Sequence, residues 1–324
     1  MNNLICIIAG EPNSINSELI GKIWKKKNTF KNLNIFIMGN YLLIKKQLKL
    51  LGIKISIKKI SKIKKENFKK KLLIYDVPLK FKNPFKVSSK AKSKYILKSF
   101  KLAVELARKK KISGLINCPI NKKETFGNNF IGITEFLAKK EKVFGKEAMI
   151  IYNKNLSVCP ITTHIKVKKV SRQISKKLIT NKLITINQFF SKKLKYKPKI
   201  GLLGLNPHND ELRENSEERK IIIPVIKNLK KKRISVHGPL PADTAFINIK
   251  KDKFDILVGM YHDQVLSPFK ALYKFDAINL TLGLPYIRVS PDHGIGRDII
   301  KKNVADPKSL LESIKFFKNI NVRT

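Results

Sequence analysis

The stretch formed by residues 255–298 constrains the fold of this chain more than any other part of the sequence. Within it, an apolar run at residues 256–260 ends abruptly in polar residues, and a second run at residues 278–287 ends in Arg288. Short apolar runs that stop at polar residues are typical of buried strands whose C-terminal ends carry a site. The sequence therefore predicts functional side chains along one edge of a sheet.

Alternating strands and helices are expected along the rest of the chain. Apolar runs at residues 4–9, 34–38 and 199–203 are each followed by a polar turn and a helical pattern, which favours an α/β fold. Two short runs between residues 149 and 159 are typical of a hairpin, so we expect a mixed sheet. A long helical region is predicted at residues 167–193.

The formal net charge of +46 is the most extreme property of the composition. Lysines supply most of it and are spread along nearly every predicted helix, whereas nucleic-acid recognition favours arginines and aromatic residues on one face. We therefore expect solvated lysine-rich surfaces and no specific nucleic-acid partner, with a non-enzymatic polyanion-binding protein as the remote alternative.

The apolar runs and the cysteines indicate the compartment. No run approaches the roughly 20 residues that span a bilayer, and the N-terminal residues are more typical of a first strand than of a signal peptide. The three cysteines, Cys6, Cys118 and Cys159, lack metal-ligand spacing. We expect a reducing cytoplasm and no membrane partner.

Three of the five histidines, His164, His208 and His262, follow separate predicted strands. Three neutral imidazoles that converge from separate strands are typical of a site for Zn²⁺ or a similar divalent ion. These residues are more than 40 positions apart, so spacing does not show convergence, and three hydrogen-bonded loop histidines are the alternative. Asp263 is expected to support a ligand or to be one.

Lys270 and Arg288 differ from the many surface lysines because both lie within the apolar stretch at residues 255–298. A cation in such surroundings needs a partner, and a substrate phosphate or carboxylate would supply one. A structural salt bridge is the alternative interpretation of each residue.

The turns of this chain, taken in order, resemble the motifs of the 4-hydroxythreonine-4-phosphate dehydrogenase family of vitamin B6 (pyridoxal phosphate) biosynthesis. They read GEPNSINSEL, NCPINK, ITEFLA, TTH, GLNPH, GPLPADTAF, MYHDQ, NLTLGLPYIR and DHG. The resemblance runs from Gly10 to about Asp298, and GPLPADT and MYHDQ are its most specific motifs.

The resemblance implies two α/β/α domains with a cleft between them, in an isocitrate/isopropylmalate-dehydrogenase-like fold. We expect residues 1–125 with 305–324 to form a terminal α/β domain. Residues 126–304 would form a second domain that carries most of the metal and substrate residues. The resemblance also implies a homodimer whose active site lies at the subunit interface and takes metal ligands from both subunits.

The functional residues of the family fall on matching positions of this sequence. They are the metal ligands His164, His208 and His262, the substrate-binding residues Thr134, Lys270, Asn279 and Arg288, and the cofactor loop Asp292, His293 and Gly294. Ile133 occupies a further substrate-binding position, where the family has histidine. Lys270 and Asp263 are the candidate catalytic residues.

The implied reaction is a metal-dependent (Zn, Mg or Co), NAD- or NADP-linked oxidation of 4-phosphooxy-L-threonine. Its product, 2-amino-3-oxo-4-(phosphooxy)butanoate, would lose CO₂ to give 3-amino-2-oxopropyl phosphate. The chain departs from the family at Ile133 and at residues 209–214 and 271–275, where small or glycine-rich segments are usual. These departures favour, as the alternative, a related metal-dependent dehydrogenase of another phosphorylated or carboxylated hydroxy acid.

Overall fold

The computed structural model describes residues 4–63, 68–127, 129–130, 132–247, 249–274 and 276–322; residue 275, in one of the altered segments, lies outside these ranges. The chain divides into two compact units: unit 1 comprises residues 1–133 and 285–322, and unit 2 comprises residues 134–284. Residues 126–133 and 285–304, expected in the second domain, belong to unit 1. Unit 2 is therefore one continuous segment inserted into unit 1.

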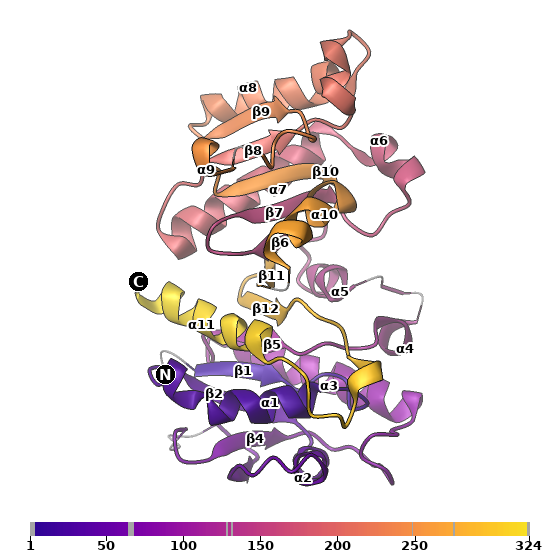
Figure 1. The fold of residues 1–324 in the computed structure, drawn as a ribbon, viewed down its shortest axis with the longest axis vertical. Helices are drawn as coiled ribbons and strands as arrows, with labels where there is room; N and C mark the ends of the chain where they lie inside the picture. The colour runs from indigo at the N-terminus through magenta and orange to yellow at the C-terminus, as the bar shows by residue number, and fades with distance from the viewer. Residues whose placement is uncertain are drawn as a thin grey trace. The chain divides into compact units, whose positions relative to one another are not determined.

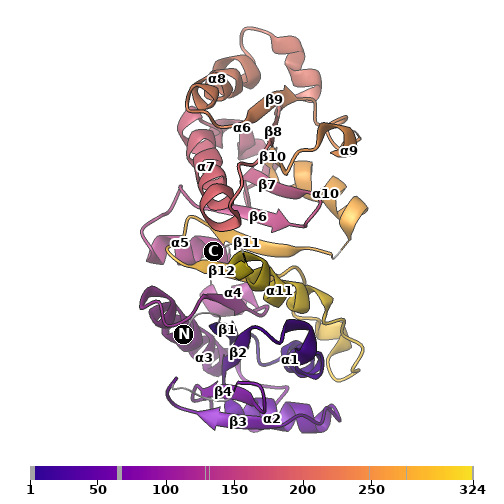
Figure 2. The same cartoon turned by 90° about the vertical axis from the view of Figure 1, so that its left-hand side faces the viewer.

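Unit 1 is built on a parallel sheet whose strands follow the order β3-β4-β2-β1-β5-β12. The strands are β1 (Leu4–Ile8), β2 (Asn34–Gly39), β3 (Ile57–Ile60), β4 (Leu72–Asp76), β5 (Gly114–Asn117) and β12 (Ile287–Pro291). The helices are α1 (Asn16–Lys25), α2 (Tyr41–Leu50), α3 (Ser89–Arg108), α4 (Lys122–Phe126) and α11 (Lys308–Val322), with the short turns η1 (Lys27–Phe30) and η6 (Arg297–Ile299). Figure 2 shows α3 on one face of this sheet and α1 and α11 on the other. All of β1 is buried, as expected of a central parallel strand covered on both faces.

Unit 2 is built on a mixed sheet whose strands follow the order β11-β6-β7-β10-β8-β9. The strands are β6 (Ala148–Tyr152), β7 (Ser157–Thr162), β8 (Ile200–Leu203), β9 (Val236–Leu240), β10 (Ile256–Tyr261) and β11 (Ile278–Leu282). The larger helices are α5 (Ile133–Lys140), α7 (Lys176–Phe189), α8 (Ile223–Lys231) and α10 (His262–Tyr273). The shorter ones are η2 (Val167–Lys169), α6 (Val170–Gln173), η3 (Phe190–Leu194), η4 (Pro207–Leu212), η5 (Glu218–Ile222) and α9 (Ile249–Asp252). Strand β6 pairs antiparallel with β7 and β11, which confirms the predicted hairpin and the mixed sheet.

Two expected elements are divided in the structure. The predicted helical region at residues 167–193 breaks at Ile174, which is extended, and Ser175 then caps α7 by accepting a hydrogen bond from a backbone N–H. The apolar run at residues 278–287 forms two strands rather than one, because the chain turns at Gly283 with a φ of +87°. Arg288 therefore lies inside β12, not after a single longer strand.

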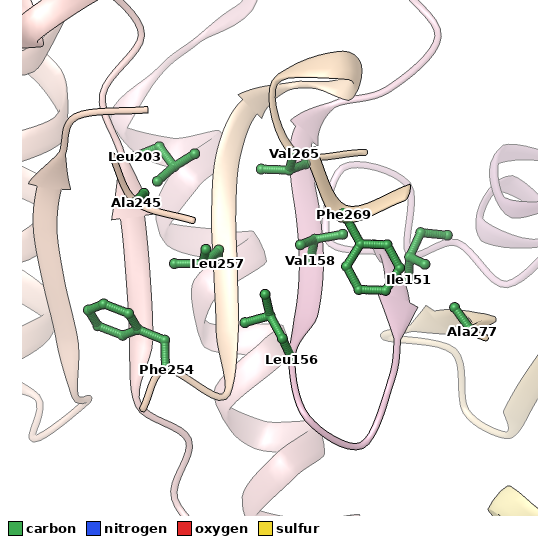
Figure 3. Close-up of a cluster of buried hydrophobic side chains, with 10 residues drawn as sticks. All are labelled: Ile151, Leu156, Val158, Leu203, Ala245, Phe254, Leu257, Val265, Phe269 and Ala277. Atoms are coloured by element: carbon green, nitrogen blue, oxygen red, sulfur yellow. The ribbon is translucent and has the colours of Figure 1, made fainter. Parts of the chain in front are cut away.

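The core of unit 2 packs α10 against the sheet (Figure 3). The ten buried side chains of this cluster are Ile151, Leu156, Val158, Leu203, Ala245, Phe254, Leu257, Val265, Phe269 and Ala277. Val265 and Phe269 are one helical turn apart on α10, and both are fully buried. Their burial holds α10, which follows β10 directly (Figure 1), against the sheet. His262, the first residue of α10, is thereby fixed at the end of β10. None of the helices in the described residues has the length and apolar character that a membrane crossing requires.

Candidate active site

Three neighbouring parallel strands of unit 2, β7, β10 and β8, end at the same edge of the sheet. His164, His262 and His208 follow these three strands in that order. The hydroxyl of Thr162 donates a 2.7 Å hydrogen bond to the carbonyl of Met260 and ties the ends of β7 and β10 together. The topology thus brings the three predicted metal ligands to one edge of the sheet.

The rings of His164 and His262 are direct neighbours. Their centroids are 5.8 Å apart and their planes are tilted by 39°. Across the described ranges of one chain, no group of three or more His, Cys, Asp or Glu side chains is placed to hold a metal ion. The structure therefore brings two of the three predicted ligands together, and the part of His208 stays a prediction.

Glu135, in the first turn of α5, lies against His164. Its Oε1 is 3.4 Å from Nδ1 of His164 and accepts a 3.2 Å hydrogen bond from the hydroxyl of Thr163. Burial by itself raises the pKa of the Glu135 carboxyl, but the neighbouring His164 and Thr163 outweigh burial and lower this pKa to about 2. Glu135 is therefore a carboxylate at neutral pH.

His262, like His164, has a carboxylate beside its Nδ1. Nδ1 of His262 lies 2.7 Å from Oδ1 of Asp263, whose side chain is 75% exposed. A carboxylate at Nδ1 favours the tautomer that carries its proton there and leaves the lone pair of Nε2 available to a cation. The role of Asp263 as a residue that supports a metal ligand stays a prediction.

His208 lies in a segment with an unusual backbone. Residues 208–212 all have positive φ, between 48° and 58°, and form a short left-handed turn without a single glycine. Left-handed conformations are unfavourable for residues with a Cβ, and asparagine tolerates them better than most. This chain therefore holds its left-handed turn under strain.

The contacts of Asn209 hold this turn. Its side chain is buried and donates a 3.2 Å hydrogen bond to the carbonyl of Pro239. A Cβ at Gly204 would lie only 2.1 Å from Oδ1 of Asn209, so the glycine makes room for this asparagine. The strained segment is thus anchored to β9 rather than free to adopt other conformations.

Two positioning residues, Glu218 and Gln264, were missed in the sequence analysis. Glu218 is fully buried, and its Oε1 accepts hydrogen bonds from the backbone N–H groups of Leu205 and Asn206 at 2.6 and 2.9 Å. Gln264 accepts from the N–H of Met260 at 2.6 Å and donates to the carbonyl of Gly204 at 2.8 Å, so it joins the ends of β10 and β8. Gln264 is the last residue of MYHDQ, whereas Glu218 lies outside the quoted motifs and contacts the backbone of GLNPH. Only the fold shows which backbone atoms the two side chains contact.

Thr134, Asn279 and Lys270, three of the predicted substrate-binding residues, belong to unit 2. The hydroxyls of Thr134 and Thr281 lie 3.0 Å apart, which joins the start of α5 to β11. Asn279 is two residues before Thr281 on the same strand and therefore shares its face. Lys270 lies on α10, not at the end of a strand.

The remaining predicted residues belong to unit 1. Arg288 is 3% exposed, and its Nε donates a 2.7 Å hydrogen bond to Oδ1 of Asn117 at the end of β5. Ile133 is buried and apolar. In the loop Asp292, His293 and Gly294, Nδ1 of His293 is 2.8 Å from the carbonyl of Gly294, and burial lowers the pKa of His293.

Some buried atoms near the expected metal and cofactor residues make no hydrogen bond. Within the described part of unit 2, Nδ1 of His164 and Oε2 of Glu135 are buried and make no hydrogen bond, although the two side chains are in contact. Imidazole nitrogens and carboxylate oxygens are donors that suit Zn²⁺ and similar ions. In the described part of unit 1, Nε2 of His293 is likewise buried without a hydrogen bond, in the loop expected to hold the cofactor. The imidazoles and the carboxylate at the edge of the unit 2 sheet are therefore donors of the kind that a divalent ion would use.

Comparison with known proteins gives the family. A family model described as "Pyridoxal phosphate biosynthetic protein PdxA" matches residues 31–317. The chain belongs to the PdxA family. Two PdxA relatives named 4-hydroxythreonine-4-phosphate dehydrogenase, from Sulfurihydrogenibium sp. and Aquifex aeolicus, are 42% and 39% identical to it. The alignments cover 96% of both chains for the first relative and 99% of both for the second.

Solved structures agree with this assignment. The 4-hydroxythreonine-4-phosphate dehydrogenase of Klebsiella pneumoniae matches with a TM-score of 0.86 and 27% identity over 98% of this chain and 99% of that one. Isocitrate dehydrogenase from Methylococcus capsulatus matches with a TM-score of 0.50 and 10% identity over 97% of this chain and 84% of that one, which concerns the fold alone. The predicted family and the isocitrate-dehydrogenase-like fold are both confirmed, and PdxA membership makes the chain a dehydrogenase of pyridoxal phosphate biosynthesis.

Proposed function

We propose that this PdxA protein oxidises 4-phosphooxy-L-threonine at C3, with NAD or NADP as the hydride acceptor and a divalent ion in the site. The observation that carries the proposal is the pair of adjacent imidazoles, each facing a carboxylate, at the ends of neighbouring parallel strands. The product is 2-amino-3-oxo-4-(phosphooxy)butanoate, which loses CO₂ to give 3-amino-2-oxopropyl phosphate.

His164, His208 and His262 hold the divalent ion in this proposal. When bound, the ion lowers the pKa of the substrate hydroxyl, and the nicotinamide accepts the hydride. Glu135 and Asp263 lie beside Nδ1 of the two neighbouring rings and favour the tautomer that leaves the opposite nitrogen, Nε2, available to the ion. The loop formed by residues 292–294 holds the adenosine side of the cofactor.

The cations and hydroxyls of the site bind and orient the substrate. Lys270 and Arg288 bind its phosphate or carboxylate, and the hydrogen bond from Arg288 to Asn117 fixes the guanidinium for bidentate contact. Thr134 and Asn279 orient it by hydrogen bonds. Lys270 is also the candidate for proton transfer during the reaction.

The decisive experiment measures NAD(P)H formation from 4-phosphooxy-L-threonine before chelation, after chelation, and after re-addition of zinc, magnesium or cobalt. We expect activity to disappear with the chelator and to return with metal, and His262→Ala to be inactive at every metal concentration. Glu105→Gln on α3 of unit 1 is a control variant outside the proposed site and should behave like wild type. Activity that is indifferent to chelation would contradict the metal role, and a metal-loaded protein without activity would contradict the substrate.

We further propose that the active protein is a homodimer whose partner subunit covers the apolar side chains beside the histidines. Ile165, Val167 and Leu212 are 37%, 72% and 43% exposed, and each lies within a few residues of His164 or His208. Large apolar side chains gathered beside a site favour a protein contact there. Sedimentation should show a dimer, and Val167→Asp should weaken the dimer and the activity together.

A second candidate substrate is D-threonate 4-phosphate. A relative from Cupriavidus necator named D-threonate 4-phosphate dehydrogenase is 38% identical over 66% of this chain and 65% of its own length. Ile133 favours this alternative, because the chain offers a buried apolar side chain where the family has an imidazole. Comparing kcat/KM for the two substrates decides between them, and Ile133→His should shift the ratio towards the substrate that carries an amine.

A further inference from the structure

Glu135 is the strongest candidate for a role that the expected site residues leave unassigned. It is a partly buried carboxylate, 3.4 Å from an imidazole that is itself next to a second imidazole. It belongs to α5, whereas His164 follows β7, so the contact joins two elements rather than two consecutive residues. Such a contact can fix the direction of a ring relative to the sheet.

The carboxylates on the two rings differ in exposure and in anchoring. The side chain of Glu135 is 19% exposed, and the hydroxyl of Thr163 holds its Oε1 on the side that faces His164. The side chain of Asp263 is 75% exposed, and it is adjacent to His262 in the chain. A buried and anchored carboxylate restricts a ring, whereas an exposed one can turn towards water.

The separation between Glu135 and His164 is at the long end for a hydrogen bond, and among the described residues Nδ1 of His164 has no other partner. Catalytic hydrogen bonds are often long in the free protein and shorten when a ligand binds. The position of Glu135 is therefore that of a group which orients a ligand when the site is loaded.

We propose that Glu135 is a positioning residue that holds the His164 ring with its Nδ1–H towards the carboxylate and its Nε2 towards the bound cation. This inference rests on the metal-dependent function proposed above. Glu135 acts through His164 and does not contact the substrate, so its loss should change metal affinity more than substrate affinity.

The first test measures Zn²⁺ affinity on the purified full-length protein by competition with a chromophoric chelator. Glu135→Gln keeps the size of the side chain but removes the charge, and we expect it to weaken zinc binding by about 10–100-fold. Asp263→Asn should weaken it less, because Asp263 is exposed. Glu105→Gln in unit 1 is the control and should bind zinc like wild type.

The second test reads the His164 ring directly. In metal-free ¹⁵N-labelled protein, we expect the His164 signal to report the Nδ1–H tautomer in wild type and a mixture of tautomers in Glu135→Gln. Thr163→Val, which removes only the hydroxyl that anchors Glu135, should have the same effects at a few-fold smaller size. This variant decides the question if Glu135→Gln does not fold.

The outcomes separate this inference from the function on which it rests. If His164→Ala loses zinc while Glu135→Gln and Thr163→Val keep wild-type affinity and tautomer, the positioning role is wrong and the metal site stands. If His164→Ala and His262→Ala both bind zinc like wild type, the proposed metal function itself is wrong.

Discussion

Two clusters of charged side chains, one in each unit, combine carboxylates with cationic or ionisable groups but differ in how completely their atoms are paired. In unit 1, the buried amine of Lys92 lies 2.8 Å from Oε1 of Glu11 and 2.7 Å from Oε2 of Glu124. The other oxygen of Glu11 accepts from the N–H of Asn121 at 3.2 Å, and the other oxygen of Glu124 is 2.8 Å from Arg297. Every carboxylate oxygen in this cluster has a partner.

The cluster in unit 2 is incomplete by the same measure. Glu135 and His164 are in contact, yet within the described residues Oε2 of the first and Nδ1 of the second make no hydrogen bond. Because buried polar atoms are normally paired, a fully paired cluster is explained by stability, whereas an incompletely paired one favours a missing ligand. The two clusters are therefore distinguished by the pairing of their polar atoms together with the neighbouring imidazoles, not by charge.

The largest expected effect is in unit 1. Lys92→Met leaves the carboxylates of Glu11 and Glu124 without their shared cation, and the free energy of unfolding should fall by roughly 3–5 kcal/mol. Urea unfolding measures it. Lys94→Met, at an exposed position of the same helix, is the control and should change stability by less than about 0.5 kcal/mol. A loss of similar size in both variants would break the comparison, since the pairing would then contribute nothing.

Zinc should stabilise the folded protein by binding at the cluster of Glu135 and His164 in unit 2. At a free concentration near one hundred times Kd, zinc should raise the free energy of unfolding of wild type by about 2.7 kcal/mol. His262→Ala should lose this gain while its metal-free stability stays close to wild type. Thermal unfolding with and without zinc checks the expectation, and an equal gain in the variant would place the ion elsewhere.

The pH dependence of stability should report Glu124. Hydrogen bonds from Lys92 and Ser89 lower the pKa of Glu124 from 4.5 to about 2, against the opposing effect of burial. A carboxyl whose pKa is lowered by folding contributes stability at pH values above its pKa in the unfolded chain. The free energy of unfolding of wild type should therefore exceed that of Glu124→Gln by about 2 kcal/mol above pH 4.5. The difference should shrink as the pH falls from about 4.5 towards 2. A difference that is constant over this range would contradict the assignment.

The smallest effect concerns the left-handed turn beside His208. Glu211 has a φ of 48°, and Glu211→Gly should raise the free energy of unfolding by about 0.5–1 kcal/mol, because glycine adopts this conformation without strain. Glu105→Gly, within the right-handed helix α3, is the same substitution and should lower it by about 1 kcal/mol. Denaturant unfolding of both variants tests the pair, and a loss in both would show that the turn is not strained.

Much of the fold followed from apolar runs, because a buried parallel strand needs a continuous apolar segment. The run at residues 256–260 predicted β10 and the polar residues after it, and the two runs between residues 149 and 159 predicted a hairpin. The run at residues 278–287 suggested a single strand, because two strands joined by a short turn have the same apolar character as one longer strand. Only the positive φ of Gly283 separates them.

The sequence predicted those residues of the candidate site that stand out by their type. It did not predict the residues whose roles depend on contacts with parts of the chain that are distant in sequence. The three histidines stood out because histidine is rare in this chain. Glu135, Glu218 and Gln264 did not, because their roles depend on backbone atoms and rings that are distant in sequence. Lys270 stood out as a cation within the apolar stretch at residues 255–298, but no apolar pattern showed that a helix begins at His262.

The insertion of unit 2 into unit 1 determines the order in which the chain can complete its parts during synthesis. Unit 2 emerges from the ribosome as one uninterrupted segment, so its sheet can assemble as soon as residue 284 is made. Unit 1 has to wait, because β5 gains its neighbour β12 only afterwards. Gly114 on β5 is closely approached by Phe317 of α11, so its final packing comes later still. The first part of unit 1 in the nascent chain therefore exposes an unfinished sheet until β12 and α11 have been made, and this interval is when a chaperone would be needed most.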